Sequence, residues 1–321
     1  MRLMKNPAMI VLAVFILSLW CCSPAEQGKG AKPSPPIKFG TLPVIQALPL
    51  FVAAEKGYFS EAGLNVELVP FSSAMEKDVA LSAGQISGYF GDMITPMVLT
   101  ANNTLVKIMA AYFNTKNEQR MFAILAAPGY AKKDLSSIAE GGVACSSNTM
   151  LEYLMVKLLA KNHIPSQKIN LVEVKSIPIR LQMLLSNQVP GAILPEPLVT
   201  LAEMKGAKAM ADDSRTGLSP TVLVFTDSFL AKHPEAVRTF LGAVQKASDF
   251  INQNSEQVRP IMNRECKIPE GLQKGFTIPA FPKLNIPKTE EVMDVYRWLR
   301  EKSIIKRDMT YEQFVAEGYV Q

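Results

Sequence analysis

Histidine is rare in this chain, and several catalytic motifs are missing from it. Its 321 residues include two histidines, His163 and His233, which stand at helix ends or in loops and lack the spacing of a metal-binding pair. The sequence contains neither a nucleophile elbow nor a phosphate-binding glycine loop. We therefore expect no metal, no cofactor and no catalytic residue.

Cysteine is also scarce, with four residues in the chain. Cys21 and Cys22 lie together near the N-terminus, so too few others are left for a disulfide scaffold. Cys145 and Cys266 could pair in an oxidising compartment. We expect two buried free thiols instead, because we assign these residues below to different lobes.

Blocks of like charge are missing as well. Removal of the N-terminal segment that carries Arg2 and Lys5 lowers the formal net charge from +5 to +3, with 32 basic residues against 29 acidic ones. A protein that binds nucleic acid normally has a basic patch or stripe, so the sequence predicts no nucleic-acid partner.

The N-terminus carries an apolar run that is too short to cross a membrane as a helix. The run covers residues 8–17, whereas a membrane-spanning helix needs about 20 apolar residues. Arg2 and Lys5 precede the run, and polar sequence follows Cys22. This arrangement is typical of a cleaved export signal, with a plain N-terminal anchor helix as the alternative.

The two adjacent cysteines predict a lipoprotein signal, in which Leu stands three residues before the modified cysteine and a small residue stands just before it. Cys22 has Leu19 and Cys21 in these places, whereas Cys21 would follow the bulky Trp20. We therefore predict cleavage of residues 1–21 and lipidation of Cys22, with Cys21 as the alternative. The protein would then lie on the periplasmic or extracytoplasmic face of the cell membrane, attached by its lipid alone.

Two regions follow the predicted signal. Residues 22–36 are rich in proline, glycine and lysine and have almost no bulky apolar side chain, so they predict a flexible tether. Residues 37–321 exceed one typical domain and suit two lobes or one large α/β unit.

Short β-like segments alternate with helical ones past the tether, as in a mainly parallel sheet covered by helices. Residues 37–41 and 65–70 predict strands. Residues 48–56 predict a helix, with Pro49 in its first turn and Gly57 after its end. Apolar stripes at helical spacing predict core-facing helices at 150–159 and 237–251.

One helix-to-strand unit occurs twice. Residues 81–90 and 184–193 align at a constant separation of 103 positions. Gly84 and Asn187 take the same place in the two copies, and both residue types tolerate the left-handed conformation that ends a helix. In open α/β sheets ligands bind beyond the carboxyl ends of strands, so the repeat predicts a cleft between two such edges.

Three stretches resemble a known family: residues 53–67, 81–92 and 184–197. They are similar to the solute receptors of ABC importers for nitrate, sulfonates, taurine and thiamine-type pyrimidines, which have the two-lobed type II periplasmic-binding-protein fold. Pro190 and Asn187 stand where this family often has Asp and Gly, so the resemblance indicates no subfamily.

The resemblance implies an α/β fold in which residues 37–123 and 224–321 form one lobe and residues 124–223 form the other. Two hinge strands would cross between the lobes near 122–126 and 222–225. It further implies a monomer that captures a small organic or oxyanionic solute and delivers it to a permease and its ATPase, without catalysis or cofactor.

The strand ends supply the candidate ligand-binding residues. Ser146, Ser147 and Thr149 stand where a predicted strand enters a helix, and free N–H groups and hydroxyls at such a place favour an oxyanion. Simple N-capping is the alternative. The remaining candidates also follow predicted strands, and they are Thr41, Gln46, Asp92, Tyr112, Asn114 and Glu196.

The carboxylates among these candidates contradict an oxyanion ligand. Asp92 and Glu196 would repel an anion but would accept hydrogen bonds from an amine or an aminopyrimidine. Asp92 could instead cap the helix that follows it. Tyr112 and Asn114 would suit a planar ligand.

Two other functions stay open. The first is a pyrimidine synthase-like enzyme of the same fold, although the cysteine-rich motif of such enzymes is missing here. The second is a sensory lipoprotein that uses the same fold to signal.

Overall fold

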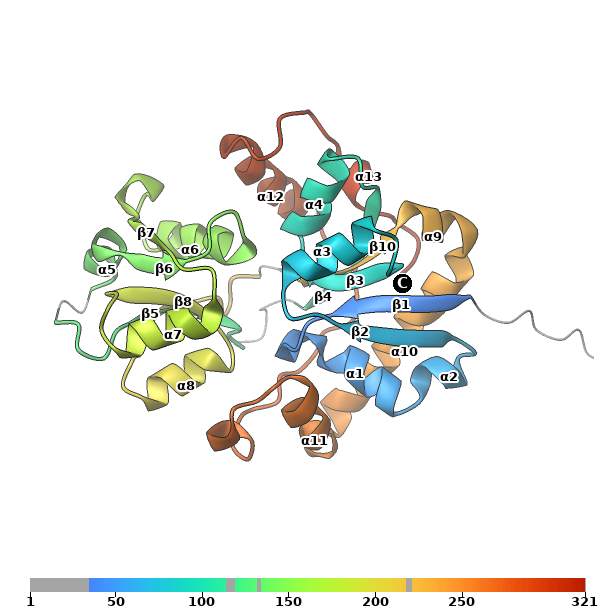
Figure 1. The fold of residues 1–321 in the computed structure, drawn as a ribbon, viewed down its shortest axis with the longest axis horizontal. Helices are drawn as coiled ribbons and strands as arrows, with labels where there is room; N and C mark the ends of the chain where they lie inside the picture. The colour runs from blue at the N-terminus through green and yellow to red at the C-terminus, as the bar shows by residue number, and fades with distance from the viewer. Residues whose placement is uncertain (1–34, 114–118, 132–133, 218–220, 321) are drawn as a thin grey trace, which may run out of the picture. The chain divides into compact units, whose positions relative to one another are not determined.

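Two five-stranded sheets form the framework of the computed structural model, which describes residues 35–113, 119–131, 134–217 and 221–320 (Figure 1). The predicted signal with Cys21 and Cys22, most of the predicted tether, and Asn114 lie outside the described residues.

The first sheet has the strand order β2-β1-β3-β10-β4. Its strands are β1 (Pro36–Thr41), β2 (Asn65–Pro70), β3 (Gly88–Asp92), β4 (Val106–Phe113) and β10 (Thr221–Thr226). The second sheet has the order β7-β6-β8-β5-β9. Its strands are β5 (Phe122–Ala126), β6 (Val143–Cys145), β7 (Leu171–Glu173), β8 (Gly191–Pro195) and β9 (Lys208–Asp212).

The two sheets share one topology. In each, the fourth strand in the order runs antiparallel to both of its neighbours, and this strand is β10 in the first sheet and β5 in the second. Each antiparallel strand is the first one that the chain forms after it leaves the other sheet. The passages between the sheets therefore come just before β5 and β10, next to the ranges where we predicted hinge strands.

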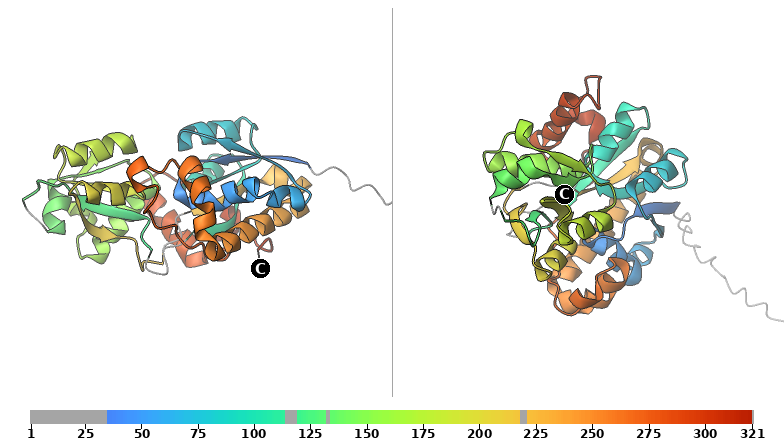
Figure 2. Two further views of the ribbon diagram at one scale, coloured as in Figure 1. Left: turned by 90° about the horizontal axis from the view of Figure 1, so that it is seen from below. Right: turned by 60° about the vertical axis from the view of Figure 1, so that its left-hand side comes forward.

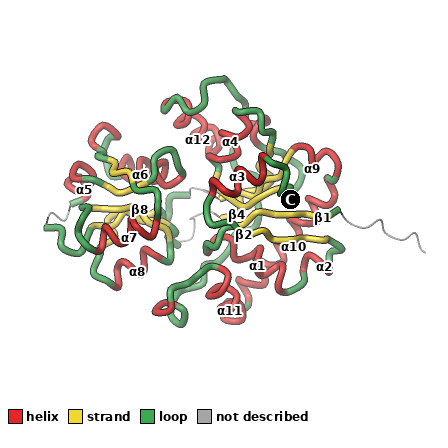
Figure 3. Tube along the Cα trace, in the orientation of Figure 1, coloured by secondary structure: helices red, strands yellow, loops and turns green. Residues whose placement is uncertain are grey.

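Helices lie on both faces of each sheet (Figures 2 and 3). The helices that flank the first sheet are α1 (Leu48–Glu55), α2 (Tyr58–Glu61), α3 (Ala74–Ser82), α4 (Ile94–Ala101), α9 (Asp227–Lys232), α10 (Pro234–Gln253), α11 (Ser255–Glu265), α12 (Thr289–Glu301) and α13 (Tyr311–Phe314). Those that flank the second are α5 (Leu135–Gly141), α6 (Met150–Lys161), α7 (Ile177–Leu185) and α8 (Leu198–Met204). Short 3-10 turns cover Ile45–Ala47, Ser166–Lys168 and Glu270–Leu272.

Local chemistry explains the boundaries of these elements. Pro49 lies in the first turn of α1, where its missing N–H costs no hydrogen bond, and Gly57 follows the helix with a φ of +76°. The stripe on α10 is buried, and Phe240 packs at a ring-centroid distance of 4.6 Å from Phe39 of β1. Both features agree with the sequence predictions.

The repeat is visible in the backbone. Gly84 follows α3 with a φ of +69°, and Asn187 follows α7 with a φ of +58°, so the left-handed helix ends occur at both predicted positions. The chain then enters β3 in one copy and β8 in the other, and both strands pair in parallel with the sheet neighbour that precedes them in the strand order.

Cys145 and Cys266 are both buried and free, as we expected. Burial raises the pKa of the Cys145 thiol to about 12. Among the residues described, no helix combines the length and the apolar character that crossing a membrane requires.

Candidate functional site

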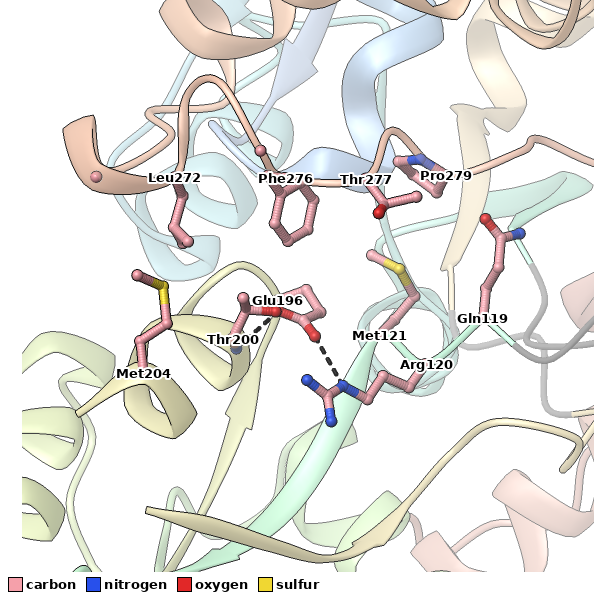
Figure 4. A pocket seen from close by; sticks show the side chains of 12 residues that line it. Gln119, Arg120, Met121, Glu196, Thr200, Met204, Leu272, Phe276, Thr277 and Pro279 are labelled. Atoms are coloured by element: carbon pink, nitrogen blue, oxygen red, sulfur yellow. Dashed lines mark hydrogen bonds and ion pairs between the residues drawn. The ribbon is translucent and has the colours of Figure 1, made fainter. Parts of the chain in front are cut away.

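A cavity of about 490 Å³ is lined by two distant parts of the sequence (Figure 4). One part comprises residues around β5 and β8 of the second sheet, and the other is the segment 271–279 after α11. Figure 4 shows Phe276 and Leu272 on one side of the cavity and Glu196 on the opposite side. A volume of this size suits a small organic ligand, since ligand pockets are commonly ~300–1,000 Å³.

Strand register explains why Arg120 and Glu196 meet in this cavity. β5 and β8 are antiparallel, with Phe122 opposite Pro195, so Met121 lies beside Glu196 and Arg120 is the next residue along the chain. The backbone N–H of Glu196 donates to the carbonyl oxygen of Met121 at 2.8 Å and extends the ladder by one step. Both side chains then emerge at the same edge of the sheet.

Glu196 is the most deeply buried charged group of the cavity, with 6% of its surface exposed. Arg120 Nε donates to its Oε1 at 2.8 Å, and the Thr200 hydroxyl donates to its Oε2 at 2.8 Å. The other nitrogens of the Arg120 guanidinium donate to Glu203 of α8. One guanidinium thus faces two carboxylates, and its hydrogen bonds to Glu203 and Glu196 raise the pKa of Arg120.

The opposite wall of the cavity is apolar. Leu272 and Phe276 come from the segment after α11, and Met121 and Met204 face the same cavity from the second sheet and α8. Methionine side chains adapt to irregular apolar shapes. The cavity thus joins an ionic side to an apolar side.

The predicted residues in and around the first sheet that the structure describes do not line this cavity. Thr41 and Gln46 are buried, and among the described atoms the hydroxyl oxygens of Thr41 and of Thr221 on β10 have no hydrogen-bond partner. Asp92 Oδ1 accepts a hydrogen bond from Thr95 N at 2.9 Å, which is the capping role that we gave as its alternative. Tyr112 is 1% exposed and packs edge-on against Phe90, so its ring belongs to the core.

A buried lysine lies near these strand ends. Lys77 of α3 is 1% exposed, and its Nζ lies 2.6 Å from Asp78 Oδ1 and 3.4 Å from the centroid of the Tyr89 ring. Burial lowers the pKa of Lys77. Gly40 makes room for its side chain, because a Cβ added at Gly40 would lie 3.2 Å from Lys77 Cγ.

The donors at the start of α6 already have partners. The backbone N–H of Ser147 donates to Glu173 Oε2 at 2.9 Å, its hydroxyl donates to the same oxygen, and these hydrogen bonds lower the pKa of Glu173. Asn148 N donates to Glu152 at 2.5 Å. The Thr149 hydroxyl donates to the Ser146 carbonyl at 2.8 Å. Carboxylates of the chain itself thus occupy the place where we predicted an oxyanion.

A model of the NMT1-like family matches residues 30–263. The chain belongs to the NMT1-like family. A relative from Brucella abortus, named only as a binding protein, is 22% identical over 223 residues, which are 68% of this chain and 67% of the relative.

Solved structures with the same fold include nitrate- and sulfonate-binding proteins. The alkanesulfonate-binding protein SsuA of Xanthomonas axonopodis pv. citri superimposes with a TM-score of 0.75 at 13% identity, covering 89% of this chain and 99% of that one. The nitrate-binding protein NrtA of Synechocystis PCC 6803 gives a TM-score of 0.67 at 15% identity, with 87% and 84% covered. The desulfurization enzyme DSZB gives 0.64 at 13% identity, with 88% and 97% covered. The two-lobed periplasmic-binding-protein fold is confirmed.

In this NMT1-like protein, Glu196 is the one predicted site residue among those described that lines the cavity. Sequence reasoning missed Arg120, Thr200, Met204 and segment 271–279. Only the pairing of β5 with β8 could have indicated Arg120, because no motif surrounds it. No group of three or more potential metal ligands occurs in the described ranges, which leave out 114–118, 132–133, 218–220 and both ends.

Proposed function

We propose that this protein is the solute-binding component of an ABC importer, which captures a small organic solute and delivers it to a permease. The observation that carries the proposal is the cavity of about 490 Å³ that combines the buried Glu196 with an apolar wall. Membership of the NMT1-like family and the fold shared with nitrate- and sulfonate-binding proteins support it.

The lobe boundaries belong to the same proposal. Residues 37–123 with 224–321 would move against 124–223 when the solute binds, since such receptors close by a hinge motion. Both chain passages between the sheets would then bend. In addition to Glu196, the predicted residues at the strand ends, such as Asp92 and Ser147, stay candidates for contact in the closed state.

The proposed attachment is a lipid on Cys22, with the protein on the extracytoplasmic face of the membrane. Inhibition of lipoprotein processing with globomycin should leave a larger precursor, and Cys22→Ala should remove the lipid, with Cys21→Ala as the matched control. Processing that is unaffected by both treatments would contradict the anchor and leave solute capture intact.

Uptake tests the transport function. Deletion of the gene should abolish import of the solute that purified protein retains in native mass spectrometry, and the Glu196→Ala protein should not restore import. Normal import in the deletion strain would contradict transport and favour the sensory alternative. Chemical conversion of the retained solute by the pure protein would favour the enzyme alternative, although the described residues that line the cavity include no cysteine, histidine or lysine.

A further inference from the structure

One carboxylate, Glu196, and one guanidinium, Arg120, line the cavity, and a second carboxylate, Glu203, pairs with Arg120 from outside the lining. The three paired groups together have a negative formal charge. Glu196 and Glu203 carry two negative charges, and Arg120 between them carries one positive charge. Arg120 is the one basic residue among the described residues that line the cavity. Lys205 and Lys274 are close to lining residues in sequence, but both are exposed to solvent, where screening weakens their field.

An anion that bound the two remaining N–H groups of Arg120 would lie beside the carboxylates that already pair with this guanidinium, and their charge would oppose it. Nε and both terminal nitrogens of its guanidinium each donate to Glu196 or Glu203. A carboxylate has about four acceptor sites, and Glu196 accepts hydrogen bonds from Arg120 Nε, Thr200 N and the Thr200 hydroxyl. One further donor therefore fits on Glu196 without breaking any bond.

Other places that could attract an anion also have carboxylate partners. Glu173 and Glu152 occupy the N–H groups at the start of α6. The ammonium of Lys77 is bonded to Asp78. In the described part of the chain, the donors at both of these places are therefore already paired with carboxylates.

The apolar wall of the cavity sets a second requirement for the ligand. Phe276 lies across the cavity from Glu196 (Figure 4), and the face of an aromatic ring attracts a cation within about 6 Å. Met204 and Leu272 extend the apolar surface beside it. A ligand that carries a positively charged nitrogen on an apolar body would satisfy both sides of the cavity.

We propose that this cavity selects an organic ammonium ion, a protonated amine on an apolar body, and rejects sulfonates and other oxyanions. The inference rests on the proposed function, because it assigns the class of solute to the same site. Glu196 and Glu203 supply the negative charge, Thr200 and Arg120 hold the Glu196 carboxylate in place, and Phe276 contacts the apolar body.

Three probes with one apolar body test the charge preference on the full-length protein in detergent. Isothermal titration calorimetry compares 2-phenylethylammonium, 2-phenylethanol and 2-phenylethanesulfonate. We expect the ammonium ion to bind at least about tenfold more tightly than the alcohol, and the sulfonate to bind most weakly. Glu196→Gln should weaken ammonium binding by about tenfold and leave alcohol binding unchanged.

Two further variants serve as a second test and as a control. Glu203→Gln should act in the same direction if Glu196→Gln does not fold. Glu61→Gln removes an exposed carboxylate that pairs with Lys246, and it should change no affinity.

Each remaining outcome decides the question. Preferred binding of the sulfonate would overturn the inference and leave solute capture intact. If no probe binds, the charge of any solute that native mass spectrometry finds on the purified protein decides: an amine supports the inference and an anion overturns it. If no probe binds and no solute is retained, both the inference and the proposed function fail.

Discussion

The hydroxyl of Tyr153 on α6 donates a hydrogen bond to Asp294 Oδ2 on α12 at 2.6 Å, which links a helix of the second sheet to a helix beside the first. Lys157 pairs with the same carboxylate at 2.5 Å, and Lys302, which directly follows α12, pairs with Glu152 of α6. Each of these contacts includes at least one charged group, so its strength depends on the distance between α6 and α12.

Loss of the Tyr153 hydroxyl should weaken this contact measurably. Tyr153→Phe keeps the edge-on packing against Trp298, at a centroid distance of 5.6 Å, and removes one hydrogen bond to a charged group. We expect the free energy of unfolding to fall by about 1.5–3 kcal/mol. Denaturant unfolding measures it, and Tyr58→Phe at a half-buried position of α2 is the control; equal stability of the two variants would contradict the prediction.

Asp213 should make stability depend on pH. Burial raises the pKa of its carboxyl from 3.8 to about 7, although Met121 N and Phe122 N donate to its Oδ1. Between about pH 4 and pH 7 the folded protein keeps a proton that the unfolded chain has lost, so this contribution to stability falls as pH rises and is level above 7.

The test compares the wild type with Asp213→Asn, which keeps the acceptor and does not titrate. The unfolding free energy of the wild type minus that of the variant should decrease from about pH 4 to about pH 7. A difference that stays constant or increases over this range would contradict the raised pKa.

The two partners of the Lys77–Asp78 pair should respond differently to substitution. Lys77→Met keeps most of the volume and removes the cost of burying a charge, so we expect a change of less than about 1 kcal/mol or a gain in stability. Asp78→Asn leaves the buried ammonium without its countercharge and should cost about 3 kcal/mol. Thermal and urea unfolding measure both, and a larger loss for Lys77→Met would reverse our interpretation.

Gly88 and Gly191 should tolerate no side chain. They occupy equivalent places in the repeat, and an added Cβ would lie 2.4 Å from the Val224 carbonyl oxygen and 2.4 Å from Ile138 Cγ2, respectively. We expect Gly88→Ala to destabilise the protein by more than about 3 kcal/mol, because the obstacle is backbone. Gly242→Ala in α10 meets no atom within 4 Å and should gain about 0.5–1 kcal/mol, which makes it the control.

Local signals predicted much of the fold. Pro49, Gly84 and Asn187 mark helix boundaries through their own backbone preferences, so the helix-to-strand units could be located without knowledge of their neighbours. Glu196 was predicted because it directly follows a strand of the repeat. These features depend on residues that are adjacent in the chain.

Contacts between distant residues could not be predicted in the same way. Cys145 pairs in register with Glu173 across two parallel strands, and this register brings Glu173 to the donors of Ser147. Arg120 reaches Glu196 only because β5 enters the second sheet antiparallel to β8. Neither register follows from a local pattern.

The strand order has a consequence for the sequence of folding events. All strands of the second sheet lie between Phe122 and Asp212, so this sheet can assemble from one continuous stretch of chain. The first sheet lacks the strand between β3 and β4 until Thr226 is available. During synthesis from the N-terminus, the middle of the chain can thus complete its sheet while the segment that emerged first still lacks the strand that joins β3 to β4.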